Sequence, residues 1–143
     1  MAAKNIKELA RQIEKLAAQA MQKQNSNTSK TVIETGKRHV QEDVYDVYSP
    51  DPNNPNSYDR TGKLKESWEV ENTPDGIAVY NSREDDGRNV AEIVESGQGY
   101  QYDFEYNGKP RPFSENTRKE LRGSNKLRES LKQDLKSLGI KVE

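Results

Sequence analysis

The chain has 143 residues, a formal net charge of -1, no cysteine and one histidine. A chain of this length forms one domain by default, and without cysteine it can form neither a disulfide nor a thiolate metal site. Charged residues make up 33% of the sequence, whereas Leu, Ile, Val and Phe together number only 25. That share lies below the roughly one-fifth at which a self-sufficient core becomes doubtful, so the composition favours a subunit of an assembly over an independent enzyme.

The charge is unevenly distributed along the chain. Residues 1–41 carry a net charge of +5, residues 42–105 a net charge of -11, and residues 106–143 a net charge of +5. Basic ends and an acidic middle can attract each other within or between subunits, or they can be solvated faces that keep the protein soluble. No apolar run approaches the roughly 20 residues of a membrane span, and the N-terminus is unlike a signal peptide. We therefore expect no membrane partner.

The N-terminal third is predicted to be helical. Five apolar residues recur there at three- and four-residue spacing, which is typical of an amphipathic helix: Ile6, Leu9, Ile13, Leu16 and Ala20. The apolar period resumes after a polar stretch, so we expect two helices at about 4–23 and 29–46. A coiled coil is the structural alternative, although fewer than about three clean heptads are present. The expected organisation is an N-terminal helical region, 1–47, and an α+β core with C-terminal helices, 48–143, within a single domain.

The clearest β-structure is a hairpin in the middle of the chain. Trp68 and Val70 alternate with glutamates, and Ile77 and Val79 continue the same face on the return strand. Between them, residues 72–76 read Asn-Thr-Pro-Asp-Gly, the order of a type I turn followed by a left-handed glycine. Period-two patterning on both sides of such a turn indicates a hairpin, and we expect its four apolar side chains to lie in the core.

Later segments complete the predicted α+β fold. Residues 88–96 are expected to form a short helix that packs on the Trp68 face, contributes Ile93 to the core and ends at Gly97. Alternating aromatic residues follow at strand spacing: Tyr100, Tyr102, Phe104 and Tyr106. They predict a half-buried strand or a surface between subunits, because their acidic neighbours disfavour a stacking platform for nucleic acid.

Two helices are expected at the C-terminus, packed on one face of the sheet. Ser114 can cap the first, which should end near Arg122. The second carries an apolar stripe that includes the core candidates Leu131 and Leu135, and Gly139 ends it.

The sequence holds no recognisable catalytic pattern. His39 is the only histidine, and no nucleophile–carboxylate arrangement is suggested near it. No glycine-rich phosphate loop is present, and the Asp51–Asn54 segment lacks the central glycine and terminal glutamate of a calcium loop. We therefore expect no enzyme activity, no metal and no cofactor.

Nucleic-acid binding is the alternative function from another class. The C-terminal part carries basic residues that could form a phosphate-facing stripe: Arg111, Arg118, Lys119, Arg122, Lys126, Arg128, Lys132 and Lys136. Acidic residues interspersed among them weaken this prediction. Because phosphate binding falls steeply with salt, negligible duplex binding at low salt would dismiss it.

The turn before the hairpin carries a resemblance to a known family. Residues 60–67 read Arg60-Thr61-Gly62-Lys63-Leu64-Lys65-Glu66-Ser67. A Thr-Gly-x-Leu-x-x-Ser turn running into a strand pair resembles the head–tail joining, or tail completion, proteins of long-tailed bacteriophages. The resemblance covers most of the chain, with a basic amphipathic helical region before the turn, Glu95-Ser96-Gly97-Gln98-Gly99 at a helix end and Arg111-Pro112-Phe113 before the last helices. The loop at 49–57 is longer than in such proteins.

The resemblance implies a structural role in the virion. Copies would form a ring, hexameric in that family, between the capsid connector or stopper and the tail-tube or tail-terminator proteins, and DNA would only pass through its lumen. The protein would act in the host cytoplasm during assembly and then remain in the tail or neck of the virion. Candidate interface residues are Glu84, Asp85, Asp86, Tyr100, Tyr102, Arg111 and Phe113.

Overall fold

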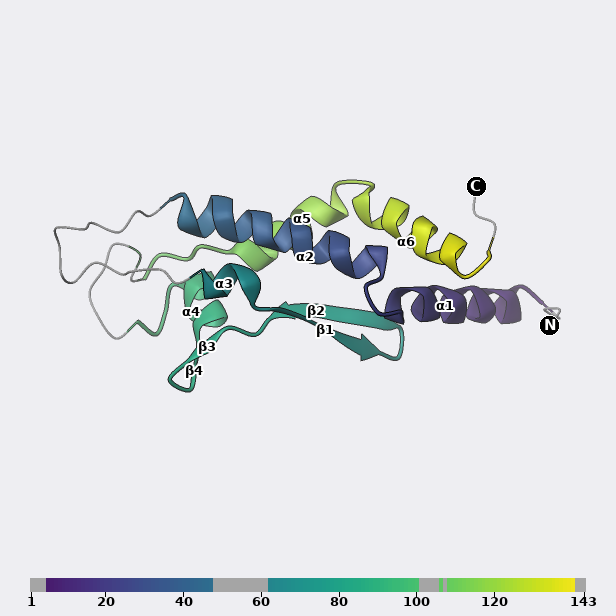
Figure 1. Cartoon of the computed structure of the whole chain (residues 1–143), viewed down its shortest axis with the longest axis horizontal. Coiled ribbons are helices and arrows are strands. Elements are labelled where there is room, and N and C mark those ends of the chain that lie inside the picture. Colours follow the sequence, from purple (N-terminus) through teal and green to yellow (C-terminus); the bar gives the residue numbers. More distant parts are fainter. Residues whose placement is uncertain (1–4, 48–61, 101–105, 107, 141–143) are drawn as a thin grey trace.

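The structure is a computed structural model of the chain and describes residues 5–47, 62–100, 106 and 108–140. Helices and two small antiparallel sheets make it an α+β fold, as predicted (Figure 1). The elements in chain order are α1 (Ile6–Gln22), α2 (Asn27–His39), the π-helix η1 (Val40–Tyr45), α3 (Lys63–Glu66), β1 (Trp68–Thr73), β2 (Gly76–Asn81), β3 (Glu84–Asp85), β4 (Arg88–Asn89), α4 (Val90–Ser96), α5 (Phe113–Arg122) and α6 (Lys126–Ser137).

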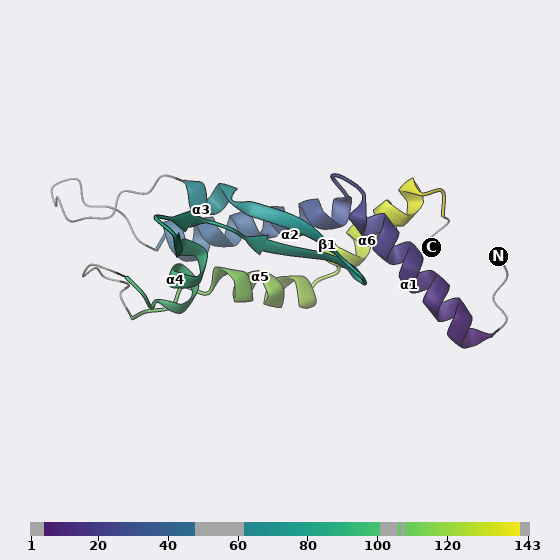
Figure 2. The same cartoon turned by 90° about the horizontal axis from the view of Figure 1, so that it is seen from below.

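Helix α2 is the central element of an elongated molecule (Figures 1 and 2). The C-terminal helices α5 and α6 pack mainly against α2, while α1 contacts β2 and α6. The fold class is as predicted. Phe113, at the start of α5, packs against Trp68 of β1, and both C-terminal helices also pack along α2.

The predicted N-terminal helices are confirmed, and polar side chains begin both of them. The side chain of Asn5 accepts a hydrogen bond from the backbone N–H of Glu8 at 2.8 Å, and the Ser26 hydroxyl accepts one from the backbone N–H of Ser29 at 3.1 Å. Such caps satisfy donors that the first helical turn leaves without partners. The end of the second predicted helix is π-helical, in η1.

The predicted hairpin is also confirmed. β1 pairs antiparallel with β2, with Trp68 opposite Asn81 and Val70 opposite Val79. Val70 is nevertheless 43% exposed, so its assignment to the core is wrong. The reason is that β1 is the outer strand, since α1 and α2 contact β2. Ile77 and Val79, on the covered strand, are half-buried.

The core gathers around Phe113, whose side chain is fully buried. Its ring meets that of Trp68 edge-on, with centroids 6.0 Å apart and planes at 89°, a favourable aromatic geometry. Trp68 is partly buried and packs against this core, as predicted. The other buried members come from three elements, η1, α3 and α4: Val40, Val44, Tyr45, Leu64, Ala91 and Val94.

Three other core predictions fall short of full burial. In α4 the buried residues are Ala91 and Val94, whereas Ile93 is half-buried. In α6 Leu131 and Leu135 are half-buried, and the buried residue is the charged Asp134. Helix α6 is covered by α1 and α2 on one side only, so part of each leucine stays in contact with solvent.

Helix α2 passes unusually close to the indole of Trp68. A Cβ atom placed on Gly36 would lie 2.6 Å from Cζ2 of Trp68. Real Cβ atoms do not approach a carbon that closely, so only glycine allows α2 to rest on the ring. This contact positions the hairpin against the central helix.

Candidate functional site

The turn that carries the family resemblance begins with a left-handed glycine. Gly62 has φ +79°, a conformation that glycine adopts without a steric penalty, and it directly precedes α3. Leu64, in the same turn, is buried in the core. Arg60 and Thr61 of the motif lie outside the described residues.

Hydrogen bonds hold this turn to the rest of the molecule. The Ser67 hydroxyl donates to the carbonyl of Lys63 at 2.5 Å, which closes the turn just before β1. The side-chain amide of Asn81, at the end of β2, donates to the Leu64 carbonyl at 2.6 Å. The motif therefore joins both strands of the hairpin to α3 and positions the start of β1.

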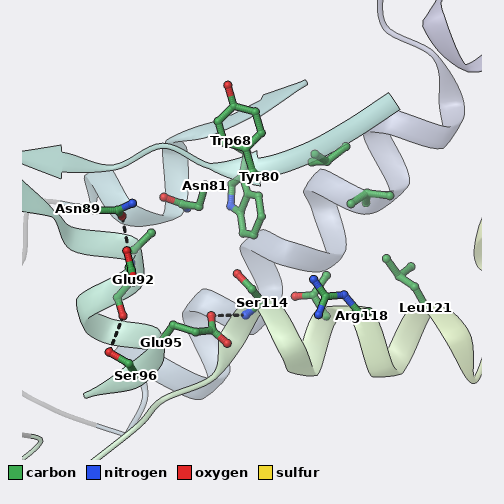
Figure 3. A pocket seen from close by; sticks show the side chains of 14 residues that line it. Trp68, Tyr80, Asn81, Asn89, Glu92, Glu95, Ser96, Ser114, Arg118 and Leu121 are labelled. Atoms are coloured by element: carbon green, nitrogen blue, oxygen red, sulfur yellow. Dashed lines mark hydrogen bonds between the residues drawn. The ribbon is translucent and has the colours of Figure 1, made fainter. Parts of the chain in front are cut away.

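A groove of about 480 Å³ lies beside this hairpin, bounded by β1, β2, α2, α4 and α5 (Figure 3). Its lining is mixed, with apolar side chains such as Trp68, Val79 and Leu121 beside polar ones such as Asn81 and Glu92. The indole Nε1 of Trp68 is buried and has no hydrogen-bond partner within the described part of the chain. A buried donor without an acceptor costs free energy, so the groove holds one donor that its own walls do not satisfy.

Glu95, on α4, connects two walls of the groove, α4 and α5. Its carboxylate accepts hydrogen bonds from the backbone N–H groups of Ser114 at 2.9 Å and Glu115 at 3.2 Å. Because Pro112, which precedes α5, provides no side-chain cap, this carboxylate from α4 takes over the capping role. These hydrogen bonds hold α4 and α5 in a fixed relation along the groove.

Two predicted interface residues lie inside the subunit instead. Phe113 is fully buried and Arg111 is 7% exposed. The Arg111 guanidinium donates to the Tyr100 hydroxyl at 2.8 Å and lies 4.5 Å from the ring centroid of Tyr106. This cation–π and hydrogen-bonded packing holds Arg111 inside the subunit, so the assignments of Arg111 and Phe113 to an interface are wrong. Tyr100 is half-buried, and its assignment to an interface stays a prediction. Tyr102 lies outside the described residues.

A network of charged groups joins η1 and α2 to α5, and the sequence alone does not reveal it. His39 lies between two carboxylates, with Nδ1 2.7 Å from Asp43 Oδ2 and Nε2 3.1 Å from Glu120 Oε1. Asn116 donates its side-chain amide to Asp43 at 2.9 Å. Since both ring nitrogens are engaged, the imidazole joins α2 to η1 and α5. The i,i+4 spacing of His39 and Asp43 is a signal that sequence reasoning missed.

Glu120 is the most strongly perturbed acid in this network. It accepts a charge-assisted hydrogen bond from Arg38 and another from Lys126 at 2.8 Å. The Arg38 hydrogen bond, followed by those from Lys126 and His39, lowers the pKa of Glu120 to about 2, although partial burial opposes the shift. The same contact raises the pKa of Arg38. Structural ion-pair networks also shift pKa values, and this network fits that interpretation.

The acidic loop after the hairpin is exposed. Glu84 and Asp85 form β3, which pairs with β4 (Arg88–Asn89), and Asp86 lies in the turn between them. All three carboxylates are at the surface, as an interface would require. Their role as an interface stays a prediction.

Several basic residues of the proposed nucleic-acid stripe are already paired. Arg118 lies 2.6 Å from Glu115, Lys126 2.8 Å from Glu120, and Lys132 3.7 Å from Glu129. Arg111 is buried. These contacts weaken a continuous phosphate-facing surface, and the salt test described above remains the experiment for this alternative.

Across the described ranges, no three His, Asp or Glu side chains are grouped so that they could hold a metal ion. No helix in the same ranges is long and apolar enough to cross a membrane.

Comparison with known proteins places the chain in a family. The model of the YomN family matches residues 5–137. The chain belongs to the YomN family. It is 40% identical over 144 residues to the SPbeta prophage-derived uncharacterized protein YomN of Bacillus subtilis (strain 168), and the match covers 99% of each chain. No solved structure matches.

The comparison supports part of the relationship that the sequence predicts. A relative of almost equal length is prophage-derived, which agrees with a bacteriophage origin. Neither the family description nor the relative's name mentions tail completion or head–tail joining.

Proposed function

We propose that this protein is a structural component of a phage particle, and that copies of it form a ring at the end of the tail where the tail joins the capsid connector. The main observation behind this proposal is the turn at Gly62, which leads directly into the hairpin. It has a left-handed glycine, a buried Leu64 and a Ser67 hydroxyl that closes the turn. These are the positions on which the resemblance to tail completion proteins depends. The prophage origin of its relative supports the same class.

The distribution of apolar surface supports a subunit role. The hairpin leaves the large apolar side chains of Val70 and Tyr80 exposed. Exposed apolar side chains that lie together mark surfaces that bind another protein. A ring built from one repeated contact between unlike patches would cover such surfaces, and a protein with this role needs no reaction chemistry.

The decisive experiment uses the phage or prophage that encodes the chain. We expect mass spectrometry of purified particles to detect the protein, and immunogold labelling to place it where head and tail meet. Deletion of its gene should leave DNA-filled heads and finished tails that do not join, and expression from a plasmid should restore whole particles. Particles that lack the protein, or normal infectious particles from the deletion strain, would refute the proposal.

A further inference from the structure

The N-terminal three turns of α1 carry an apolar stripe that nothing in the described molecule covers. Ile6 is 86% exposed, Leu9 47%, Ile13 58% and Leu16 39%. All four lie on one side of the helix, because their spacing alternates between three and four residues. This is the largest group of exposed aliphatic side chains on one described element.

Only the C-terminal end of α1 is attached to the body. There the side-chain amide of Gln22 donates to the carbonyls of Thr73 and Gly76 at 2.8 and 3.0 Å, and Ala18 and Ala20 are buried. The N-terminal turns project beyond the hairpin (Figure 2). A short helix in water is marginally stable unless its apolar face packs against something, so this projecting part requires a partner.

We propose that the partner is α1 of a second copy of this chain, and that the two helices pair in antiparallel orientation. Isoleucine at positions 6 and 13 and leucine at positions 9 and 16 give the a and d pattern of a two-stranded helical seam. The positions that flank the stripe are small or uncharged, which allows close approach: Ala10, Gln12, Ala17 and Gln19. A seam of this kind is complementary to a copy of itself.

The attachment of α1 favours the antiparallel orientation. Since each helix is attached to its body at its C-terminal end, this orientation places the two bodies at opposite ends of the pair. A parallel pair would bring the bodies together.

The first test measures mass in solution for three purified proteins. The wild type and an Arg11→Gln variant should each show a mass of twice 16.3 kDa as concentration rises, whereas Ile13→Glu should remain at the mass of one chain. Both substitutions lower the net charge by one and both positions are exposed, but Arg11 lies on the opposite side of α1 from the stripe. Near-ultraviolet circular dichroism checks that the Ile13→Glu body remains folded. A wild type that stays a single chain, or an Ile13→Glu variant with the wild-type mass, would overturn the proposal.

The second test uses the absence of cysteine from the chain. An antiparallel seam sets Leu9 opposite Ile13 of the partner subunit, so an oxidised mixture of Leu9→Cys and Ile13→Cys proteins should cross-link more than either protein alone. Arg11→Cys should not cross-link. Preferential cross-linking of Leu9→Cys to Val79→Cys in the groove would show that α1 binds a neighbour's groove instead and would overturn the pairing. Both tests use purified protein, so their result is independent of whether the chain occurs in a particle.

Discussion

The carboxylate of Asp134, on α6, caps the first turn of α2 by binding Thr28, which lies 106 residues earlier in the chain. Asp134 Oδ2 accepts hydrogen bonds from the backbone N–H and the hydroxyl of Thr28 at 2.8 and 2.6 Å, and Oδ1 accepts one from the backbone N–H of Asn27 at 2.6 Å. Asp134 is 3% exposed. A buried carboxylate at a helix N-terminus also interacts favourably with the helix dipole, so one side chain connects the C-terminal helix to the central one.

Replacing Asp134 with alanine should destabilise the protein strongly. The change removes the cap and leaves buried N–H donors of α2 without acceptors, for an expected loss of about 2–3 kcal/mol in the free energy of unfolding. Urea unfolding followed by circular dichroism measures this loss. Glu129→Ala, at an exposed position of the same helix, is the control and should change stability little. Equal effects of the two substitutions would show that the cap is unimportant.

Gly36→Ala should destabilise the protein, although alanine is ordinarily the better helix former by about 1 kcal/mol. The added methyl would lie 2.6 Å from the Trp68 ring, and overpacking of this kind costs about 1–3 kcal/mol. The sign of the change in melting temperature is therefore the test. A Trp68→Phe substitution should reduce the penalty of Gly36→Ala, because the smaller ring leaves room for the methyl. A more stable Gly36→Ala protein would contradict the close packing of α2 on Trp68.

The sequence predicts Phe113 at an interface and Val70 in the core, whereas the structure buries Phe113 and exposes Val70. Phe113→Ala should cost about 3–5 kcal/mol, as expected for a fully buried aromatic side chain, whereas Val70→Ala should stay within about 0.5 kcal/mol because the position is exposed. Chemical unfolding of both variants gives the comparison directly. A mild Phe113→Ala variant would mean that the ring is not central to the core.

Gly62 tests the turn that carries the family resemblance. Its φ of +79° is costly for a β-branched residue, so Gly62→Val should lower the melting temperature clearly. Gly62→Asn should be tolerated better, since asparagine adopts the left-handed conformation more readily. No atom lies within 4 Å of a Cβ at this position, so a difference between the two variants reports backbone conformation and not crowding. Equal melting temperatures for Gly62→Val and the wild type would contradict the left-handed turn.

Local patterns in the sequence predict the local structure well. The spacing of apolar residues predicts α1 and α2, and the alternation around a Pro-Asp-Gly turn predicts the hairpin. Each of these features depends on residues a few positions apart, and each is confirmed. The predicted aromatic strand after Tyr100 lies mainly outside the described residues.

The partners of each element could not be predicted in the same way. Period-two alternation places Val70 and Trp68 on one face, but it does not reveal that helices cover β2 and leave β1 exposed. The Arg111-Pro112-Phe113 segment looks like a loop before a helix, and only the tertiary fold brings Phe113 against Trp68. The contacts of Asp134 with Thr28 and of His39 with Glu120 each join residues more than 80 positions apart, a separation at which no spacing rule applies.

The pKa of Glu120 makes the stability of the α2–α5 contact dependent on pH. In the folded protein Arg38 and Lys126 lower that pKa to about 2 from an ordinary value of 4.5. Because the unfolded chain binds the proton more readily, the stabilisation is fully present above the ordinary value and is lost as the pH falls toward the folded value. The side chain is 25% exposed, and solvent and salt therefore reduce the effect.

Glu120→Gln should lower the melting temperature by a few degrees at neutral pH. The difference from the wild type should shrink as the pH is lowered from about 5 to about 3, because protonation removes the same charge from the wild type. Added salt at neutral pH should also reduce it. Glu115→Gln is the matched control on the same helix, since Glu115 pairs with Arg118 at a more exposed position and should affect stability little. A Glu120→Gln difference that stays constant from neutral to acidic pH would show that the carboxylate charge does not stabilise the contact between α2 and α5.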